Sequence, residues 1–215
     1  MISEVKNMDC MEYMAQFPDN YFDLAIVDPP YGIDVDVKNN TDKIQSKKSA
    51  TKSKKYGFQS WDSKTPNDDY FEELKRVSKK QIIWGANYFG LIGGMIYWHK
   101  NVTMPTYSTG ELAWVSWLTK IDFVNIAWHG MIQHDMSNKE NRIHPTQKPV
   151  TLYRWLLQNY AKQGDKILDT HLGSGSSRIA ADMEGFDFYA CELDKDYFDA
   201  SCKRFEQYKL QTKLL

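Results

Sequence analysis

This chain of 215 residues has few cysteines, no long apolar run and almost no net charge. Its three cysteines have no metal-site spacing and cannot all pair, which favours reduced thiols in a cytoplasmic protein. No apolar stretch is long enough to span a bilayer, and the first residues contain no apolar signal region, so we expect no membrane partner. The net charge of −1 excludes the overall basicity of a simple nucleic-acid-binding protein, so any DNA contact must come from a local patch.

What the chain does contain fits one domain, 1–215. Its hydrophobic fraction of 42% and its charged fraction of 26% are ordinary for a globular protein with a single core. Aromatic residues make up 14% of the chain and include seven Trp and thirteen Tyr. Packing explains most of them, and a pocket for a nucleobase would also use a few.

Strands and helices alternate along most of the sequence. Apolar runs predict strands over 22–27, 81–84, 94–98, 121–128, 166–169 and 188–192. Apolar residues spaced three or four apart predict helices over 68–79, 151–162, 176–184 and 197–209. Asn67 is placed to cap the start of the first helix, and Gly185 the end of the third. This alternation is typical of an α/β fold with a mostly parallel sheet.

Residues 34–57 break this alternation. The segment has almost no apolar residues, and its lysines stand among Asn, Ser and Thr. Such a segment cannot offset the entropy of ordering, so we expect a mobile loop in the free protein. We also expect it to contact DNA phosphates, with a steep dependence of affinity on salt, above all through Lys47, Lys48, Lys52, Lys54 and Lys55.

A glycine turn follows the predicted strand that ends at Asp169. Gly173, Ser174 and Gly175 separate this strand from a helix whose free N–H groups could meet a carboxylate or a phosphate. The dinucleotide fingerprint requires a third glycine where this chain has arginine, which disfavours a pyrophosphate cofactor. Glu192 ends the next strand, roughly 20 residues further on, where an acid can accept hydrogen bonds from both ribose hydroxyls of a nucleoside cofactor.

The run Asp28, Pro29, Pro30, Tyr31 follows an apolar strand near the start of the chain. The prolines fix φ and hold a stiff turn at a strand's carboxyl end, where open α/β sheets place their ligands. Asp28 and the Pro29 carbonyl can each accept one N–H of an exocyclic amine, which frees the nitrogen lone pair for attack. Tyr31 can stack on a base that has flipped out of a duplex.

A third run, His144–Pro149, completes a combination of motifs that resembles a known family. The chain resembles the amino-methylating DNA methyltransferases that use S-adenosylmethionine, in the permuted order called the beta class. Those enzymes carry Asp-Pro-Pro-Tyr first and the glycine turn last, as this chain does, and the similarity covers most of residues 6–205. The resemblance implies a three-layer, Rossmann-like α/β fold with a circularly permuted, mostly parallel sheet.

The resemblance also implies a role for each matching residue. The catalytic loop would consist of Asp28, Pro29, Pro30 and Tyr31. The pocket for S-adenosylmethionine would be formed by Asp9, Thr146, Lys148, Asp169, His171, Gly173, Ser174, Gly175 and Glu192. Among these, the glycine turn and Asp169 would hold the methionine end, Glu192 the ribose, and Asp9 would lie near the adenine. Asn87, in a segment that resembles a loop beside the flipped base, would contact DNA. Residues 114–142 would form a small target-recognition region, and no metal is expected because a sulfonium methyl is already activated.

Two positions depart from the family's pattern. His171 stands where the family usually has Phe. Residues 97–100 read Tyr-Trp-His-Lys where close relatives often read Trp-Asp-Lys. Neither change removes a group that methyl transfer needs.

The sequence therefore predicts a DNA methyltransferase that acts on the N6 amine of a flipped adenine in double-stranded DNA. Cytosine-N4 methylation is the nearest alternative, and Asp28 favours adenine because relatives that act on cytosine more often carry Ser there. A protein or RNA amine methyltransferase and a non-catalytic DNA-binding module are further alternatives. The resemblance leaves open a homodimer, a restriction partner and a stand-alone phage enzyme.

Overall fold

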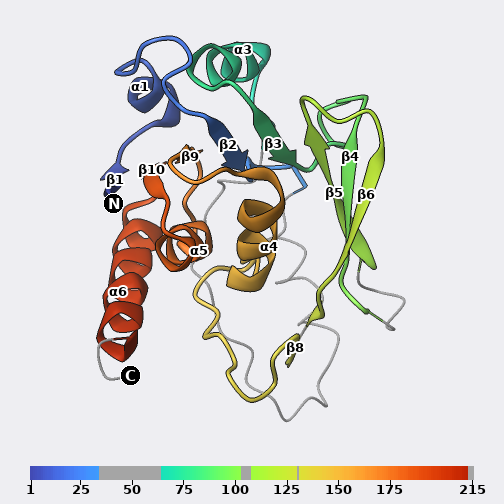
Figure 1. Ribbon diagram of the computed structural model, residues 1–215, viewed down its shortest axis with the longest axis vertical. Coiled ribbons are helices and arrows are strands. Elements are labelled where there is room, and N and C mark those ends of the chain that lie inside the picture. The colour runs from blue at the N-terminus through green and yellow to red at the C-terminus, as the bar shows by residue number, and fades with distance from the viewer. Residues whose placement is uncertain (34–63, 103–107, 130, 213–215) are drawn as a thin grey trace.

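The computed structural model describes residues 1–33, 64–102, 108–129 and 131–212 (Figure 1). The predicted lysine-rich loop, 34–57, lies outside the described residues. The five lysines proposed to contact DNA lie outside them as well, so their predicted role stays a prediction.

A central sheet runs through the described part of the chain. Its strands are β1 (Ser3–Asn7), β2 (Leu24–Val27), β3 (Gln81–Trp84), β4 (Met95–His99), β5 (Gly110–Val115), β6 (Ile121–Asn125), β9 (Lys166–Asp169) and β10 (Asp187–Glu192). They lie in the order β1-β10-β9-β2-β3-β5-β4-β6. The first five are parallel, β5 is antiparallel to both neighbours, and β6 runs parallel to β4. The predicted α/β class with a mostly parallel sheet is confirmed.

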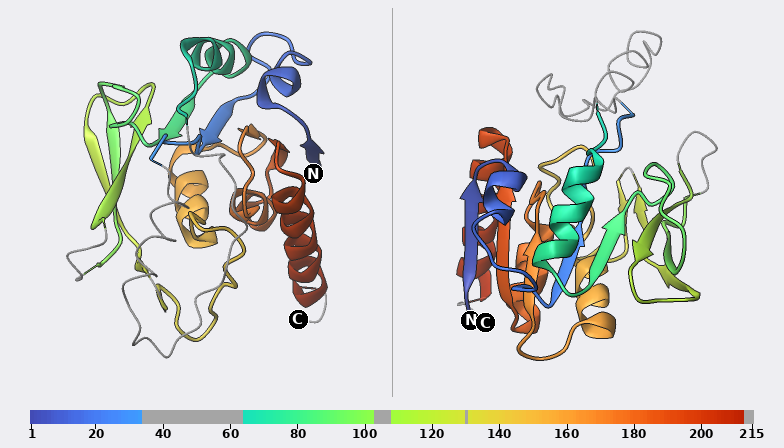
Figure 2. Two further views of the ribbon diagram at one scale, coloured as in Figure 1. Left: turned by 180° about the vertical axis from the view of Figure 1, so that it is seen from behind. Right: turned by 90° about the horizontal axis from the view of Figure 1, so that it is seen from above.

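Helices cover both faces of this sheet and make three layers (Figure 2). They are α1 (Cys10–Met14), α3 (Asp68–Val77), α4 (Val150–Tyr160), α5 (Ser176–Glu184) and α6 (Lys195–Thr212). Side chains of α1 and α3 share one apolar cluster with one face of the sheet, and those of α4 and α5 share the other cluster. Of the described helices, none is long and apolar enough to cross a membrane.

Strand β2 shows why the sequence buries this region on both faces. Leu24 and Ile26 belong to the cluster beneath α4 and α5, whereas Ala25 and Val27 belong to the cluster beneath α1 and α3. All four side chains are buried. A strand between two helical layers needs a continuous apolar run, and this run is what predicted it.

Local signals place the helix ends as expected. The Asn67 side chain accepts a hydrogen bond from the Tyr70 N–H at 3.3 Å and caps the start of α3. Gly185 follows α5 with φ of 79°, a left-handed conformation that glycine adopts at little cost. Both predicted caps are confirmed.

Several elements differ from the expectations. No sequence pattern predicts β1, α1 or β5, because these elements are short or interrupted by polar residues. The predicted strand 121–128 ends at Asn125, and Trp128–His129 (β7) pairs instead with Ile132–Gln133 (β8) in a separate antiparallel ribbon. Trp128 is buried, and its Nε1–H donates to the Gln147 carbonyl at 2.6 Å, which fixes the start of this ribbon.

The order of strands brings the two motif-bearing corners together. β2 and β9 are parallel neighbours, so the turns that follow them emerge at the same edge of the sheet. From β9 the chain passes to β10 on one side, and from β2 it passes to β3 on the other side. Such a reversal opens a crevice at the carboxyl ends of the strands, where α/β folds bind ligands.

Candidate active site

Two cavities meet at the carboxyl ends of β2 and β9. The first encloses about 580 Å³ and lies among the turn after β2, the loop after β3, and strands β4 and β5. The second encloses about 450 Å³ and lies among the turn after β9, the end of β10 and the start of α1. Both cavities are lined by Asp28, Pro30, Thr146, Gln147 and Lys148. A molecule in one cavity can therefore reach a molecule in the other only past this shared wall.

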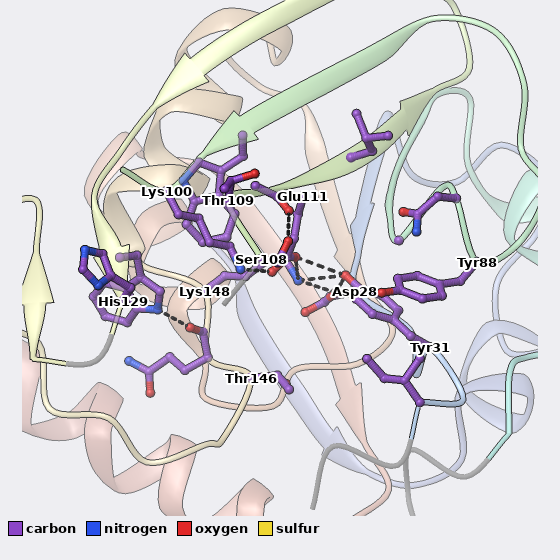
Figure 3. A pocket seen from close by; sticks show the side chains of 18 of the residues that line it. Asp28, Tyr31, Tyr88, Lys100, Ser108, Thr109, Glu111, His129, Thr146 and Lys148 are labelled. Atoms are coloured by element: carbon purple, nitrogen blue, oxygen red, sulfur yellow. Dashed lines mark hydrogen bonds and ion pairs between the residues drawn. The ribbon is translucent and has the colours of Figure 1, made fainter. Parts of the chain in front are cut away.

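Asp28 follows β2 and points into the first cavity (Figure 3). Its Oδ1 atom accepts a hydrogen bond from the Tyr31 hydroxyl at 2.6 Å and lies 2.5 Å from the Lys148 ammonium nitrogen. Among the described residues both contacts reach Oδ1, which leaves Oδ2 for a ligand. Only 17% of the side chain is exposed, so the carboxylate is a strong acceptor with little competition from water.

Lys148 joins Asp28 to a second carboxylate. The Lys148 side chain is 3% exposed, and its Nζ lies 3.1 Å from an oxygen of Glu111 on β5. Lys100, just after β4, forms an ion pair with the other oxygen of Glu111. Two lysines and two acids thus alternate in one cluster, so that each buried charge has a partner, as burial of charge requires.

Burial and pairing act against each other in this cluster. Burial disfavours the charged form of Glu111, but the attraction of Lys148 and Lys100 outweighs it and lowers the Glu111 pKa to about 2. Burial would lower the pKa of Lys148, yet its two carboxylate partners raise it. The pKa of Asp28 is raised, because burial outweighs the nearby Lys148 charge. Ionised Asp28 therefore depends on Lys148 remaining beside it.

Aromatic rings form one side of the first cavity. The rings of Tyr31 and Tyr88 are stacked, with centroids 4.8 Å apart and planes inclined by 15°. Gly85 has φ of 79°, and a Cβ there would lie 2.3 Å from the Tyr31 ring. Glycine at this position therefore makes room for Tyr31. Asn87 also lines this cavity, as expected for a residue beside a flipped base, although contact with DNA stays a prediction.

The glycine turn lines the second cavity with two of its three residues. Gly173, with φ of 50°, and the buried Ser174 both face it. Gly175 does not line the cavity. It caps α5 with φ of 72°, and a Cβ there would approach Ser201 of α6 to 3.3 Å. Its role in this structure is to let the chain turn and α6 pack closely.

Two acids reach the second cavity from neighbouring strand ends. One oxygen of Glu192 accepts the Gly173 N–H at 2.8 Å, and the other accepts the Asp194 N–H at 2.9 Å. Burial raises the pKa of Glu192. Asp9 caps α1, since its Oδ1 accepts the Met11 N–H at 2.8 Å, and it lines the same cavity. Both carboxylates are held by backbone N–H groups and keep lone pairs for a ligand.

Asp169 lies behind the glycine turn and does not line the second cavity. The residue is 1% exposed, and its carboxylate accepts the Ser177 hydroxyl at 2.6 Å and the His171 N–H at 3.0 Å. Burial raises its pKa to about 7. Asp169 therefore shapes the turn in this structure, whereas the family resemblance implies that it holds the methionine end of the cofactor, a role that stays a prediction.

Two histidines stand in the wall of the second cavity in their neutral form. Burial lowers the pKa of His171 to about 4. Burial, together with the nearby Lys148 charge, lowers the pKa of His144 to about 3. Thr146 lies with its hydroxyl 3.1 Å from the His144 ring nitrogen Nδ1. The predicted cofactor residues Thr146 and His171 thus do line this cavity.

The family resemblance predicts Lys148 only as a residue of the cofactor pocket, and no sequence motif indicates its partners Glu111 and Lys100. Glu111 and Lys100 lie far from Lys148 along the chain and join it only through the pairing of β4 with β5. The one sequence feature that could have indicated this cluster is Glu111, a charged residue within the otherwise apolar β5. No group of three metal-ligating side chains was found among the described residues.

The predicted target-recognition region, 114–142, is in part structural. It begins at the end of β5 and contains β6, both in the central sheet. Beyond β6, three of its residues line the first cavity: Trp128, His129 and Arg142. Its role in recognising a DNA sequence stays a prediction.

Comparison with known proteins agrees with this arrangement. Residues 98–203 match a family model described as a DNA methylase. The chain is 26% identical over 207 residues to the protein YubD of Escherichia coli K12, which covers 91% of this chain and 87% of YubD. It is 23% identical over 251 residues to the type II methyltransferase M2.MboI of Moraxella bovis, with 93% of this chain and 86% of that protein covered.

Two solved structures show the same fold. One is the complex of M1.HpyAVI with SAM, with a TM-score of 0.58, 19% identity, and 95% of this chain and 99% of that chain covered. The other is the cytosine-N4-specific PvuII DNA methyltransferase, with a TM-score of 0.62, 15% identity, and 95% and 86% covered. By these comparisons the chain is a relative of the amino-methylating DNA methyltransferases that use S-adenosylmethionine, and residues 98–203 match the DNA methylase family model.

The neutral state of His171 makes a prediction about stability. Its pKa falls from the usual 6.5 to about 4, so between these values the folded protein binds fewer protons than the unfolded chain. The free energy of unfolding should then decrease as pH falls through this window, by up to about 1.4 kcal/mol per pH unit. We expect His171→Phe to reduce the slope of unfolding free energy against pH, because phenylalanine does not titrate. The slope is measured by urea unfolding between roughly pH 7 and pH 4, the range in which His171 changes its charge. The exposed His134→Gln serves as control, and an unchanged slope in His171→Phe would contradict the assignment.

Proposed function

We propose that this protein transfers a methyl group from S-adenosylmethionine to the N6 amine of an adenine flipped out of double-stranded DNA. The observation that carries the proposal is the position of Asp28 in the wall between two cavities. The first cavity would take the base and the second the cofactor. Acceptor and donor would then meet beside the Asp28 carboxylate, which is only 17% exposed.

The side chains of the second cavity fit the cofactor. Glu192 ends β10 with both oxygens held in place and can accept the ribose hydroxyls. Asp9 can accept N–H groups at the adenine end. His171 is neutral, so it adds no positive charge beside a cationic sulfur. When bound, S-adenosylmethionine supplies a methyl group that is already activated.

The residues of the first cavity suit an exocyclic amine. Asp28 can accept one N–H of the amine through Oδ2, and the Pro29 carbonyl can accept the other. This pull draws the nitrogen toward tetrahedral geometry and directs its lone pair to the shared wall. Asp28 need not remove a proton before attack, because the proton can leave once the nitrogen has become cationic. Catalysis then consists of desolvation and alignment of the reacting atoms.

Tyr31 would stack on the base. In the free protein Tyr88 already stacks on it at 4.8 Å, which supports a planar ring at this place in the cavity. The 44% exposed Tyr88 can move aside when the base enters. The hydrogen bond from the Tyr31 hydroxyl to Asp28 would then keep the ring and the acceptor in register.

Adenine and cytosine both carry an amine that suits these acceptors. Asp28 supports adenine, because relatives that act on cytosine more often carry Ser at that position. Further parts of the proposal concern DNA. Lys47, Lys48, Lys52, Lys54 and Lys55 would contact phosphates, Asn87 the region of the flipped base, and residues 114–142 the target sequence.

Analysis of the methylated product tests the choice of base. Duplex DNA incubated with the protein and S-adenosylmethionine is digested to nucleosides, which are identified by mass spectrometry. We expect N6-methyl-2′-deoxyadenosine among the nucleosides. N4-methylcytosine alone would contradict the choice of adenine, and methyl transfer to protein or RNA but not to DNA would contradict the proposal as a whole.

Substitution of the proposed catalytic carboxylate tests the mechanism. Asp28→Ala should lower the turnover number by about 100-fold or more, since a preorganised group aimed at developing charge is lost. Its affinity for S-adenosylmethionine, measured by calorimetry, should stay close to that of the wild type. Glu192→Gln is the matched control with the opposite signature, because it should weaken cofactor binding more than turnover at saturating cofactor. A turnover number in Asp28→Ala equal to that of the wild type would contradict the proposed role of Asp28.

A further inference from the structure

The tip of the ribbon formed by β7 and β8 carries two exposed apolar side chains, and a third follows the ribbon. Met131 is 73% exposed and Ile132 46% at the tip, and Met136, beyond β8, is 52% exposed. Three large apolar side chains in one short segment face water in the free protein. Exposed apolar groups that gather in this way mark a surface that contacts a partner.

The base of the ribbon is firmly held, in contrast to its tip. Trp128 is buried, donates to the Gln147 carbonyl at 2.6 Å and lies under the Arg142 guanidinium, 4.3 Å from its ring centroid. Opposite Trp128 in the register stands the buried Gln133. Its side-chain amide donates to the Glu140 carbonyl at 2.9 Å and accepts the Glu140 N–H at 2.7 Å.

Glu140 extends this anchor to the body of the protein. One of its carboxylate oxygens accepts the N–H of Val150 at the start of α4, at 2.9 Å. The other lies 2.7 Å from the Arg204 guanidinium on α6. The ribbon is therefore fixed to two helices, so its apolar tip is presented by a rigid support.

The ribbon also borders the cavity proposed for the flipped base. Trp128, His129 and Arg142 line that cavity together with Asp28 and Tyr31. Figure 3 shows His129 on the side of the cavity away from Tyr88. The apolar tip continues directly from His129, since Ile132 pairs with His129 in the ribbon. An extrahelical base in the cavity would thus bring the rest of its duplex next to this tip.

We propose that Met131, supported by Ile132, enters the DNA base stack and fills the space that the target base leaves. The proposal rests on the proposed function, because it requires a base flipped into the first cavity. Flipping a base costs a few kcal/mol of stacking and pairing. Architectural DNA-binding proteins insert apolar side chains between base steps, and a side chain that enters the gap left by a flipped base restores contacts with the neighbouring bases. The unbranched thioether of methionine suits an irregular gap of this kind.

The position of the wedge makes the test specific. Removing a side chain that only fills the gap should slow methylation when the target base is paired. It should have little effect on the rate when that base is already unpaired. A residue that reads a base edge matters equally in both cases. A residue in a contact between two copies of the chain changes the oligomeric state instead.

The experiment compares two duplexes that carry the chain's methylation site, mapped first by modified-base sequencing of DNA from cells that express the protein. In one duplex the target base is paired, and in the other it faces an abasic position. We expect Met131→Ala to slow methylation of the paired duplex by about tenfold or more and to leave the abasic duplex within about threefold of wild type. Ile132→Ala should show a smaller effect of the same kind. Leu210→Ala, an exposed apolar residue on α6, is the control and should change neither rate.

Direct observation of flipping complements the rates. With 2-aminopurine at the target position, the wild type should raise fluorescence on binding, and Met131→Ala should raise it less. If Met131→Ala slows methylation equally on both duplexes, or on neither, the proposal that Met131 enters the base stack is contradicted. A shift from dimer to monomer in Met131→Ala with unaltered flipping would overturn it as well. If the wild type methylates neither duplex, the proposed function fails first, and that outcome is distinct from failure of the wedge.

Discussion

The contact between Asp28 and Lys148 is the interaction on which the rest of the site depends. Asp28 follows a strand near the beginning of the chain, and Lys148 belongs to the run that precedes α4. Their side chains meet at 2.5 Å in the wall shared by both cavities. Because Lys148 is 3% exposed, its charge cannot be compensated by water and must be met by protein acceptors. The same contact therefore joins two distant segments and holds the acceptor of the site in place.

Glu111 and Lys100 complete the balance of charge around this pair. Without Glu111, Lys148 would face Asp28 alone and would compete more strongly with any ligand for its lone pairs. Without Lys148, two carboxylates that are only 17% and 22% exposed would lie close together, and the pKa of Asp28 would rise further. Lys148 favours the ionised form of Asp28 against burial and the Glu111 charge, while one Asp28 oxygen remains open toward the first cavity. That condition is what an acceptor for an amine requires.

Much of the fold could be predicted because its signals are local. The buried run of β2, the cap at Asn67 and the left-handed Gly185 each depend on a few neighbouring residues. Helix α1 is five residues long and β5 contains a glutamate, so neither shows a clear period. The site was predictable where a motif lies in one segment. The salt bridges from Lys148 to Asp28 and Glu111 join three separate segments, so no local pattern encodes them. The inward position of Asp169 depends on how α5 packs, which no local pattern encodes.

A double-mutant cycle between Asp28 and Lys148 tests the central claim most directly. The free energy of unfolding is measured by urea titration for the wild type, Asp28→Asn, Lys148→Met and the double variant. If the buried pair holds the two segments together, the two effects should be non-additive by about 1 kcal/mol or more, with the double variant less destabilised than the sum. Asp28→Asn combined with Lys195→Met, which alters an exposed lysine paired with Asp199, should be additive within about 0.5 kcal/mol. Additive effects for Asp28 and Lys148 would contradict the account.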